Sequence, residues 1–206
     1  MNAFKAIRNN IPNTITCLNL FAGAMACVFA LKGNEPVGNL TSYQVAFIFI
    51  VLAAMFDFCD GLVARLLNLV SPIGKELDSL SDCVSFGLAP AMLLYAAMEH
   101  FNPGDVANYS AFLIAVFGAL RLAKFNVDTT QTTTFKGLPI PANAIFWLGY
   151  VNMCYERDSM NFAVYLLILA LGWFMVCNMP MFSFKMKNFG IKSNWYRYLL
   201  VAIVVA

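Results

Sequence analysis

The chain has 206 residues, of which 61% belong to the hydrophobic set and only 12% are charged. Soluble domains carry about 45–50% apolar and about 25% charged residues, so this chain has too little charge to cover a globular surface. A disordered class is excluded on the same grounds, and a net charge of +2 lacks the basic excess of a nucleic-acid-binding protein. The composition predicts an all-α, polytopic membrane protein in which each crossing takes about 20 residues.

Apolar runs predict six transmembrane helices, at residues 12–32, 43–67, 77–98, 108–127, 139–156 and 161–183. Before the first of them, Phe4, Ile7 and Ile11 recur at helical spacing with basic residues between them. This pattern predicts an amphipathic helix that lies at the membrane surface.

A last apolar run begins near Tyr196 and reaches Ala206 after too few residues to cross a bilayer. We interpret this run as part of a seventh helix, with a tail along the membrane interface as the alternative. The connections are short and the chain shows no internal repeat. Residues 1–206 are therefore expected to form a single membrane-embedded domain.

The positions of lysine and arginine predict the orientation of the helices. With a cytoplasmic N-terminus, eleven of the thirteen basic residues fall on the cytoplasmic side, and Lys32 and Arg157 fall outside. Positively charged connections stay on the cytoplasmic side of a membrane. The sequence thus predicts an inner-membrane protein with its N-terminus, and the acidic segment described next, facing the cytoplasm.

Four aspartates interrupt the apolar background around the second connection. Asp57 and Asp60 are three residues apart near the end of the second predicted helix, and Asp78 and Asp82 are four apart at the start of the third. Residues at these spacings share one helix face. The intervening Ser-Pro-Ile-Gly at 71–74 predicts a turn, so the two acidic faces are expected to meet.

Converging carboxylates in a membrane repel one another and are usually functional. A divalent cation resolves the repulsion, and carboxylate oxygens suit Mg²⁺ or Mn²⁺. Two such ions could stabilise both sides of a phosphoryl displacement. Small residues, Gly61, Ala64 and Gly74, leave room near the aspartates, and the Arg65 guanidinium can pair with phosphate. This segment predicts a metal-dependent site for a phosphate-bearing ligand.

The pattern D-x-x-D-G-x-x-A-R-x8-G-x-x-x-D-x-x-x-D resembles the signature of the CDP-alcohol phosphatidyltransferase family, with every fixed position present from Asp57 to Asp82. The resemblance implies a six-helix membrane core, commonly dimeric, with an N-terminal amphipathic helix on the cytoplasmic side. It also implies that two divalent cations are bound by Asp57, Asp60, Asp78 and Asp82, and that Asp82 is in addition the general base.

The resemblance extends to the donor lipid, CDP-diacylglycerol. The family's N-terminal P-x-x-x-T element matches residues 12–16, which implies contacts from Asn13 and Thr16, and Ser71 matches a further donor contact. Together with Gly61, Ala64, Arg65 and Gly74, these residues form the expected CDP-lipid site.

Three further stretches resemble one branch of the family, the membrane-bound phosphatidylserine synthases. They read I-P-N-T-I-T-C-L-N-L-F-A-G, L-D-S-L-S-D-C-V-S-F-G-L-A-P-A, and R-L-A-K-F-N-V followed by F-K-G-L-P-I-P-A. The resemblance implies L-serine as the acceptor. Lys124 is a departure, because many relatives carry arginine there, and lysine lacks the bidentate geometry of arginine.

Free serine carries a carboxylate and an ammonium group, so its pocket needs a cation and hydrogen-bonding groups. Arg121 and Lys124 lie three apart near the cytoplasmic end of the fourth helix, and Asn126 and Ser85 could add hydrogen bonds. The alternative for the two cations is an interfacial role that sets topology.

Two other functions are open. The same family uses other acceptors, such as glycerol 3-phosphate or inositol phosphate, although the modest cationic site disfavours a phosphorylated one. A divalent-cation transporter would explain carboxylates in membrane helices, but not the spacing of Gly61, Ala64 and Arg65. Transporter sites also tend to lie at the midplane of the membrane.

Overall fold

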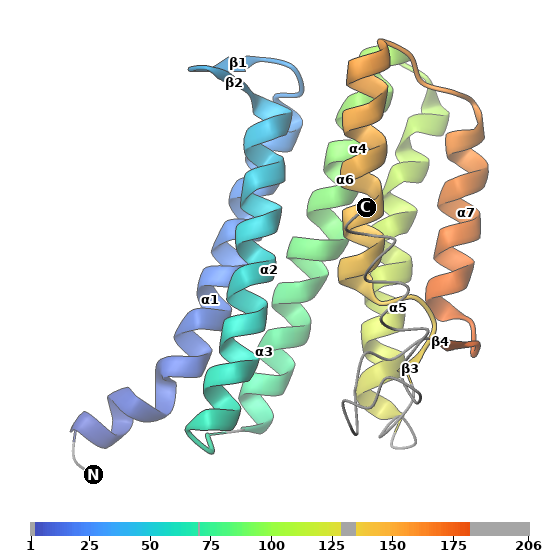
Figure 1. Ribbon diagram of the computed structural model, residues 1–206. Helices are drawn as coiled ribbons and strands as arrows, with labels where there is room; N and C mark the ends of the chain where they lie inside the picture. Colours follow the sequence, from blue (N-terminus) through green and yellow to red (C-terminus); the bar gives the residue numbers. More distant parts are fainter. Residues whose placement is uncertain (1–2, 70, 129–134, 182–206) are drawn as a thin grey trace, which may run out of the picture.

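The computed structural model describes residues 3–69, 71–128 and 135–181, and these residues are almost entirely helical (Figure 1). The last apolar run, from Tyr196, lies outside the described residues. The helical elements are α1 (Ala3–Leu31), α2 (Ser42–Leu66), α3 (Pro72–Asp82), the π-helical turn η1 (Cys83–Leu88), α4 (Ala89–Phe101), the 3₁₀ segment η2 (Val106–Phe112), α5 (Leu113–Val127), α6 (Ile140–Arg157) and α7 (Ala163–Val176). Two short antiparallel pairs join β1 (Pro36–Val37) to β2 (Leu40–Thr41) and β3 (Phe135–Lys136) to β4 (Pro180–Met181).

The helices fall into two groups (Figure 1). Helices α1, α2 and α3 lie on one side and α4 to α7 on the other. Because α3 runs through η1 into α4 without a break, one continuous helix of 30 residues, Pro72–Phe101, belongs to both groups. With η2 continuing into α5, the described residues contain six long helical stretches, as the apolar runs predict.

Four of these stretches in the described residues are long and apolar enough to cross a membrane: Asn10–Leu31, Ser42–Leu66, Pro72–Phe101 and Val106–Val127. The helix predicted at 161–183 is shorter than expected, because α7 has 14 residues and ends at Val176. At about 1.5 Å per residue it covers about 21 Å, less than the roughly 30 Å of a hydrocarbon core. Residues 177–181 instead turn back to pair with 135–138, and Leu138 N–H donates to the carbonyl of Phe174 at 2.9 Å.

The N-terminal segment does not form a helix separate from the first predicted span. Helix α1 continues from Ala3 through Pro12 into the first predicted span, and its N-terminal end bends away from the other helices (Figure 1). Proline within a helix removes one backbone hydrogen bond and introduces a kink. The amphipathic segment is therefore helical as predicted, but it is joined to the first span.

The turn between α2 and α3 also differs from the prediction. Helix α2 ends at Leu66, and Asn68 follows in the left-handed conformation (φ 54°), with the N–H groups of Asn68 and Leu69 donating to the carbonyls of Arg65 and Ala64. This is the Schellman arrangement, which asparagine tolerates. Helix α3 then begins at Pro72 rather than near residue 77. Proline suits a first helical position, and Ser71 caps the helix by accepting from Gly74 N–H at 3.0 Å.

Small side chains set the close packing of α1 against α2. Ala22, Ala26 and Ala30 recur every fourth residue on α1 and are 0–3% exposed, and Ala46 and Ala53 of α2 are fully buried. Such stripes let membrane helices approach closely. Large apolar side chains on the outside of the bundle remain exposed, as expected for a surface that faces lipid.

The π-helical turn η1 follows directly after Asp82. Its widened hydrogen bonding is seen where Ala89 N–H donates to the carbonyl of Val84, five residues back. Pro90 has no N–H to donate to the carbonyl of Phe86, so a regular α-helix is disfavoured here. Single π-helical turns of this kind are often found at functional sites.

Candidate metal and nucleotide site

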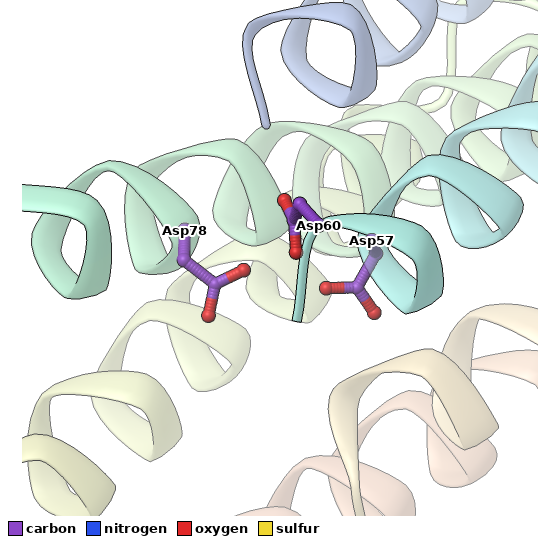
Figure 2. A group of neighbouring side chains, drawn as sticks. All are labelled: Asp57, Asp60 and Asp78. Atoms are coloured by element: carbon purple, nitrogen blue, oxygen red, sulfur yellow. The ribbon is translucent and has the colours of Figure 1, made fainter. Parts of the chain in front are cut away.

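Three carboxylates meet where α2 and α3 pack together (Figure 2). Asp57 and Asp60 come from α2 and Asp78 from α3, and one oxygen of each lies within 4.8 Å of the others. Asp60 is 6% exposed, and its Oδ2 has no hydrogen-bond partner in the described part of the chain. A buried carboxylate oxygen without a donor is costly. Hard oxygen ligands grouped in this way fit Mg²⁺ or Mn²⁺.

The fourth aspartate lies beside this group of three and has its own partner. Asp82 ends α3 and interacts electrostatically with Asp57 and Asp78. Its Oδ1 accepts from Asn19 Nδ2 of α1 at 3.4 Å. The convergence of all four aspartates that the sequence predicts is therefore present, with three close enough to share one ion and Asp82 adjoining them.

An open cavity adjoins the carboxylates on the side of α1. All seven residues predicted for the CDP-lipid site line it: Asn13 and Thr16 from α1, Gly61, Ala64 and Arg65 from α2, and Ser71 and Gly74 at the start of α3. Asp60 and Asp78 line the same cavity, so residues predicted to bind phosphate and residues predicted to bind metal share one space.

Glycines keep this cavity open. A Cβ atom at Gly74 would lie 3.0 Å from Ser71 Oγ and 3.1 Å from Asn13 Oδ1, closer than ordinary van der Waals contact. Arg65 extends along the cavity wall, and its Nε donates to the carbonyl of Gly61 at 3.0 Å. That bond fixes the guanidinium at the cavity while leaving its terminal nitrogens available for an anion.

Some residues at the site were not predicted. Lys75 lines the cavity and donates from Nζ to the carbonyl of Asn126 at 3.3 Å. Asn19 is fully buried, yet it touches Asp82. In the sequence, Asn19 is recognisable only as a polar residue within an apolar helix, three positions after Thr16. Both side chains are buried. Such a residue also occurs as a simple helix-packing group, so the sequence does not reveal its neighbour.

Arg121 is the predicted acceptor-site residue that the structure leaves most available. It is partly buried in α5, its Nε has no hydrogen-bond partner among the described residues, and its guanidinium lies 5.9 Å from the ring centroid of Phe125. A buried guanidinium nitrogen without an acceptor favours an anionic ligand.

The other three predicted serine contacts have protein partners. Lys124 is exposed and caps α7, donating to the carbonyl of Val176 at 2.9 Å and to Asn178 Oδ1 at 2.6 Å. Asn126 Nδ2 donates to Ser79 Oγ at 2.8 Å. These bonds join α5 to α7 and α3 and give both side chains partners within the protein.

Ser85 is also committed to the protein. It is fully buried, and its hydroxyl lies 2.7 Å from Asn19 Oδ1 and 3.1 Å from the Asn19 carbonyl. The Ser85 hydroxyl is thus enclosed between α1 and η1, next to Asn19, which in turn contacts Asp82. A contact of Ser85 with serine stays a prediction.

Comparison with known proteins agrees with this geometry. The model of the family described as CDP-alcohol phosphatidyltransferase matches residues 9–182, which include every residue named above at the cavity and the carboxylates. The chain belongs to this family.

Relatives of this phosphatidyltransferase carry a more specific name. This chain is 34% identical over 203 residues to a CDP-diacylglycerol–serine O-phosphatidyltransferase of Helicobacter pylori, and the match covers 95% of this chain and 79% of that protein. A protein of the same name from Bacillus subtilis is 34% identical over 180 residues, covering 86% of this chain and 92% of the relative. Another protein of that name, from Saccharomyces cerevisiae, is 40% identical over 176 residues, and the match covers 79% of this chain and 62% of the relative.

Proposed function

We propose that this enzyme transfers the phosphatidyl group from CDP-diacylglycerol to L-serine, giving phosphatidylserine and CMP. The observation that carries the proposal is the single cavity that joins the predicted nucleotide residues to a group of three aspartates. The serine acceptor is further supported by the names of relatives at 34–40% identity.

The donor would place its diphosphate between the carboxylates and Arg65. Arg65 offers a planar guanidinium, and Gly61 and Gly74 let the ligand approach the backbone of both helices. Ser71 and Asn13, which flank Gly74, would bind the nucleotide end of the donor. The acyl chains would then extend into the bilayer along the exposed apolar face of α2.

Asp57, Asp60 and Asp78, with Asp82 beside them, would hold two Mg²⁺ or Mn²⁺ ions. When bound, these ions would neutralise charge on the diphosphate and on the departing CMP. The carboxylate geometry fits such ions because Asp60 keeps an unpartnered buried oxygen.

The chain's own residues then carry the displacement. Arg121 would bind the serine carboxylate, and Asp82 would accept the proton of the serine hydroxyl. The hydroxyl oxygen attacks the phosphorus that bears the diacylglycerol, a new O–P bond forms, and the P–O bond to CMP breaks. Proton transfer of this kind contributes about 10²–10⁴-fold to a rate. No enzyme nucleophile is needed, so the proposal is a direct displacement without a phosphatidyl-enzyme.

Two further expectations from the sequence belong to this proposal. The basic connections favour an orientation with the N-terminus and the site at the cytoplasmic face of an inner membrane. The family resemblance favours a homodimer. Both are tested in membranes, the first by labelling of single cysteines from each side and the second by crosslinking.

The decisive experiment measures CMP release by the purified protein in detergent with CDP-diacylglycerol and Mn²⁺ or Mg²⁺. Serine, glycerol 3-phosphate, inositol phosphate or no acceptor is added in parallel. We expect release that depends on both serine and metal. Release with a different alcohol would overturn serine as the acceptor. A covalent phosphatidyl-enzyme trapped in the absence of acceptor would overturn direct displacement.

A further inference from the structure

A buried polar pair adjoins Asp82, and neither of its residues lines the cavity described above. It consists of Asn19 of α1 and Ser85 of η1, both fully buried. The Ser85 hydroxyl lies 2.7 Å from Asn19 Oδ1, and Asn19 Nδ2 lies 3.4 Å from Asp82 Oδ1. Three side chains from two helices therefore form one hydrogen-bonded row that ends on the proposed base.

The direction of the hydrogen bonds in this row follows from its chemistry. An ionised carboxylate accepts only, so the nitrogen of the Asn19 amide must face Asp82. The amide oxygen then faces Ser85, which donates its hydroxyl hydrogen to it. Ser85 donates to the amide oxygen of Asn19, and the amide nitrogen donates to Asp82. Ser85 thereby determines which end of the Asn19 amide points at the carboxylate.

Close packing prevents the row from shifting. Gly23 lies one helical turn beyond Asn19 on α1, and a Cβ atom there would overlap the Ser85 hydroxyl and approach Ser85 Cα to 2.8 Å. One turn in the other direction, Ser81 Oγ donates to the carbonyl of Leu77 in its own helix at 2.8 Å and lies 3.2 Å from the carbonyl of Thr16. The α1 helix is thus packed closely against the α3–η1 helix on both sides of Asn19.

We infer that Asn19 is a positioning residue, oriented by Ser85, that fixes the carboxylate plane of Asp82 for proton abstraction. Holding Oδ1 by a neutral donor gives the second oxygen of Asp82 a defined place without neutralising the group. The inference rests on the proposed role of Asp82 and adds to it two residues that touch no substrate. Outer partners of this kind typically change activity by about 10–100-fold when removed.

The test compares variants of the full-length protein by steady-state kinetics in detergent. Asn19→Leu removes the donor to Asp82, and we expect kcat to fall about 10–100-fold. The KM values for serine and CDP-diacylglycerol should stay within about twofold, because Asn19 lines neither site. Ser85→Ala leaves the amide in place but free to turn, and should give a smaller fall in kcat, about 3–10-fold.

Ser81→Ala is the matched control. Ser81 is as deeply buried as Ser85, lies in the same interface with α1, and donates to a backbone carbonyl instead of to Asn19. Its loss should leave kcat unchanged while costing comparable thermal stability. A fall in kcat for Ser81→Ala equal to that for Ser85→Ala would show that helix packing alone is responsible, and would overturn the inference.

A double variant separates positioning from folding if Asn19→Leu is too unstable to purify. Asn19→Leu with Ser85→Ala removes both polar partners together, which is tolerated better than leaving one unpaired. We expect stability to recover and kcat to stay low. Recovery of kcat together with stability would overturn the inference.

Mn²⁺ binding, followed by electron paramagnetic resonance, provides a readout that does not depend on turnover. Asn19→Leu should keep its Mn²⁺ affinity within about threefold, since Asn19 is hydrogen-bonded to Asp82 and the three carboxylates close enough to share one ion are those of Asp57, Asp60 and Asp78. If the Mn²⁺ affinity of Asn19→Leu fell by the same factor as kcat, Asn19 would act on the metal site as a whole, and the inference that it positions Asp82 would be overturned. If wild-type protein prefers another alcohol, the proposed acceptor fails, and the same variants are compared with that alcohol.

Discussion

Two groups of acidic side chains lie about 30 Å apart along the continuous Pro72–Phe101 helix, and they are built in opposite ways. At the far end, every carboxylate oxygen of Glu99 and Asp105 accepts a hydrogen bond. Asn108 donates to Glu99 at 2.7 Å, Asn102 and Tyr165 donate to Asp105 at 3.2 and 3.5 Å, and backbone N–H groups supply the rest. At the site, three carboxylates instead face one another, and Asp60 Oδ2 has no donor in the described residues.

The difference in hydrogen bonding indicates a different role for each group of carboxylates. Neutral donors that fully surround a carboxylate stabilise its charge and join neighbouring segments, here the connection between α4 and η2. Carboxylates that face one another without donors destabilise the fold unless a cation binds. The hydrogen bonds around Glu99 are those of a structural group, whereas the arrangement of Asp57, Asp60 and Asp78 is the one expected of a cation site.

The largest effect is expected from removing one carboxylate of the site. Asp78→Asn should lower serine-dependent CMP release by about 10³-fold or more, because metal binding contributes several kcal/mol of charge stabilisation. The unfolding temperature should not fall, since one of three like charges is lost. Glu99→Gln is the control and should keep full activity but lose stability. An Asp78→Asn enzyme with a tenth of the wild-type rate would contradict the metal role of this group.

The next effect concerns Arg121, whose buried Nε has no hydrogen-bond partner among the described residues. Arg121→Ala should raise the KM for serine about 10–100-fold, since a hydrogen bond to a charged group contributes about 1.5–3 kcal/mol. The KM for CDP-diacylglycerol should change little. Arg157→Ala, at the opposite end of the bundle, is the control and should change neither value. Equal changes in both KM values would place Arg121 at the donor site instead.

A smaller effect is expected from adding one methyl group to the cavity wall. Gly74→Ala brings a Cβ atom to 3.0 Å from Ser71 Oγ and 3.1 Å from Asn13 Oδ1. Overpacking of this kind costs about 1–3 kcal/mol, so the KM for CDP-diacylglycerol should rise about tenfold. Gly149→Ala, in α6, meets nothing within 4 Å and should be neutral. An unchanged donor KM would exclude a close approach of the ligand at Gly74.

The smallest effect on activity is expected at the fully bonded group. Asn108→Ala leaves a Glu99 oxygen without its 2.7 Å donor, and should lower the free energy of unfolding by about 1–3 kcal/mol. CMP release by the folded protein should be unchanged. Denaturant titration of wild type and variant in the same detergent measures the stability. A tenfold loss of kcat in the folded variant would show that the group at Glu99 also affects activity, and would contradict the difference in role between it and the group at Asp57.

The sequence by itself determined the composition class, the helical stretches and a set of residues that line the cavity. Apolar runs mark helices because a backbone in lipid must satisfy its own hydrogen bonds. Seven predicted CDP-lipid residues line one cavity because helix periodicity sets which positions share a face, and the capped turn at Ser71 brings α2 and α3 together. Local rules of this kind are readable from residue spacing.

Contacts between segments distant in the chain were decided only by the tertiary structure. The spacing of Arg121, Lys124 and Asn126 is compatible with a common pocket, yet Lys124 caps α7 and Asn126 bonds to α3. The pairing of Asn19 with Asp82 spans 63 residues of sequence, and its pairing with Ser85 spans 66. The choice of partner for a long polar side chain depends on which helix lies opposite. Packing of the whole bundle settles that choice, because the energies of alternative hydrogen bonds are nearly equal until one of them is buried.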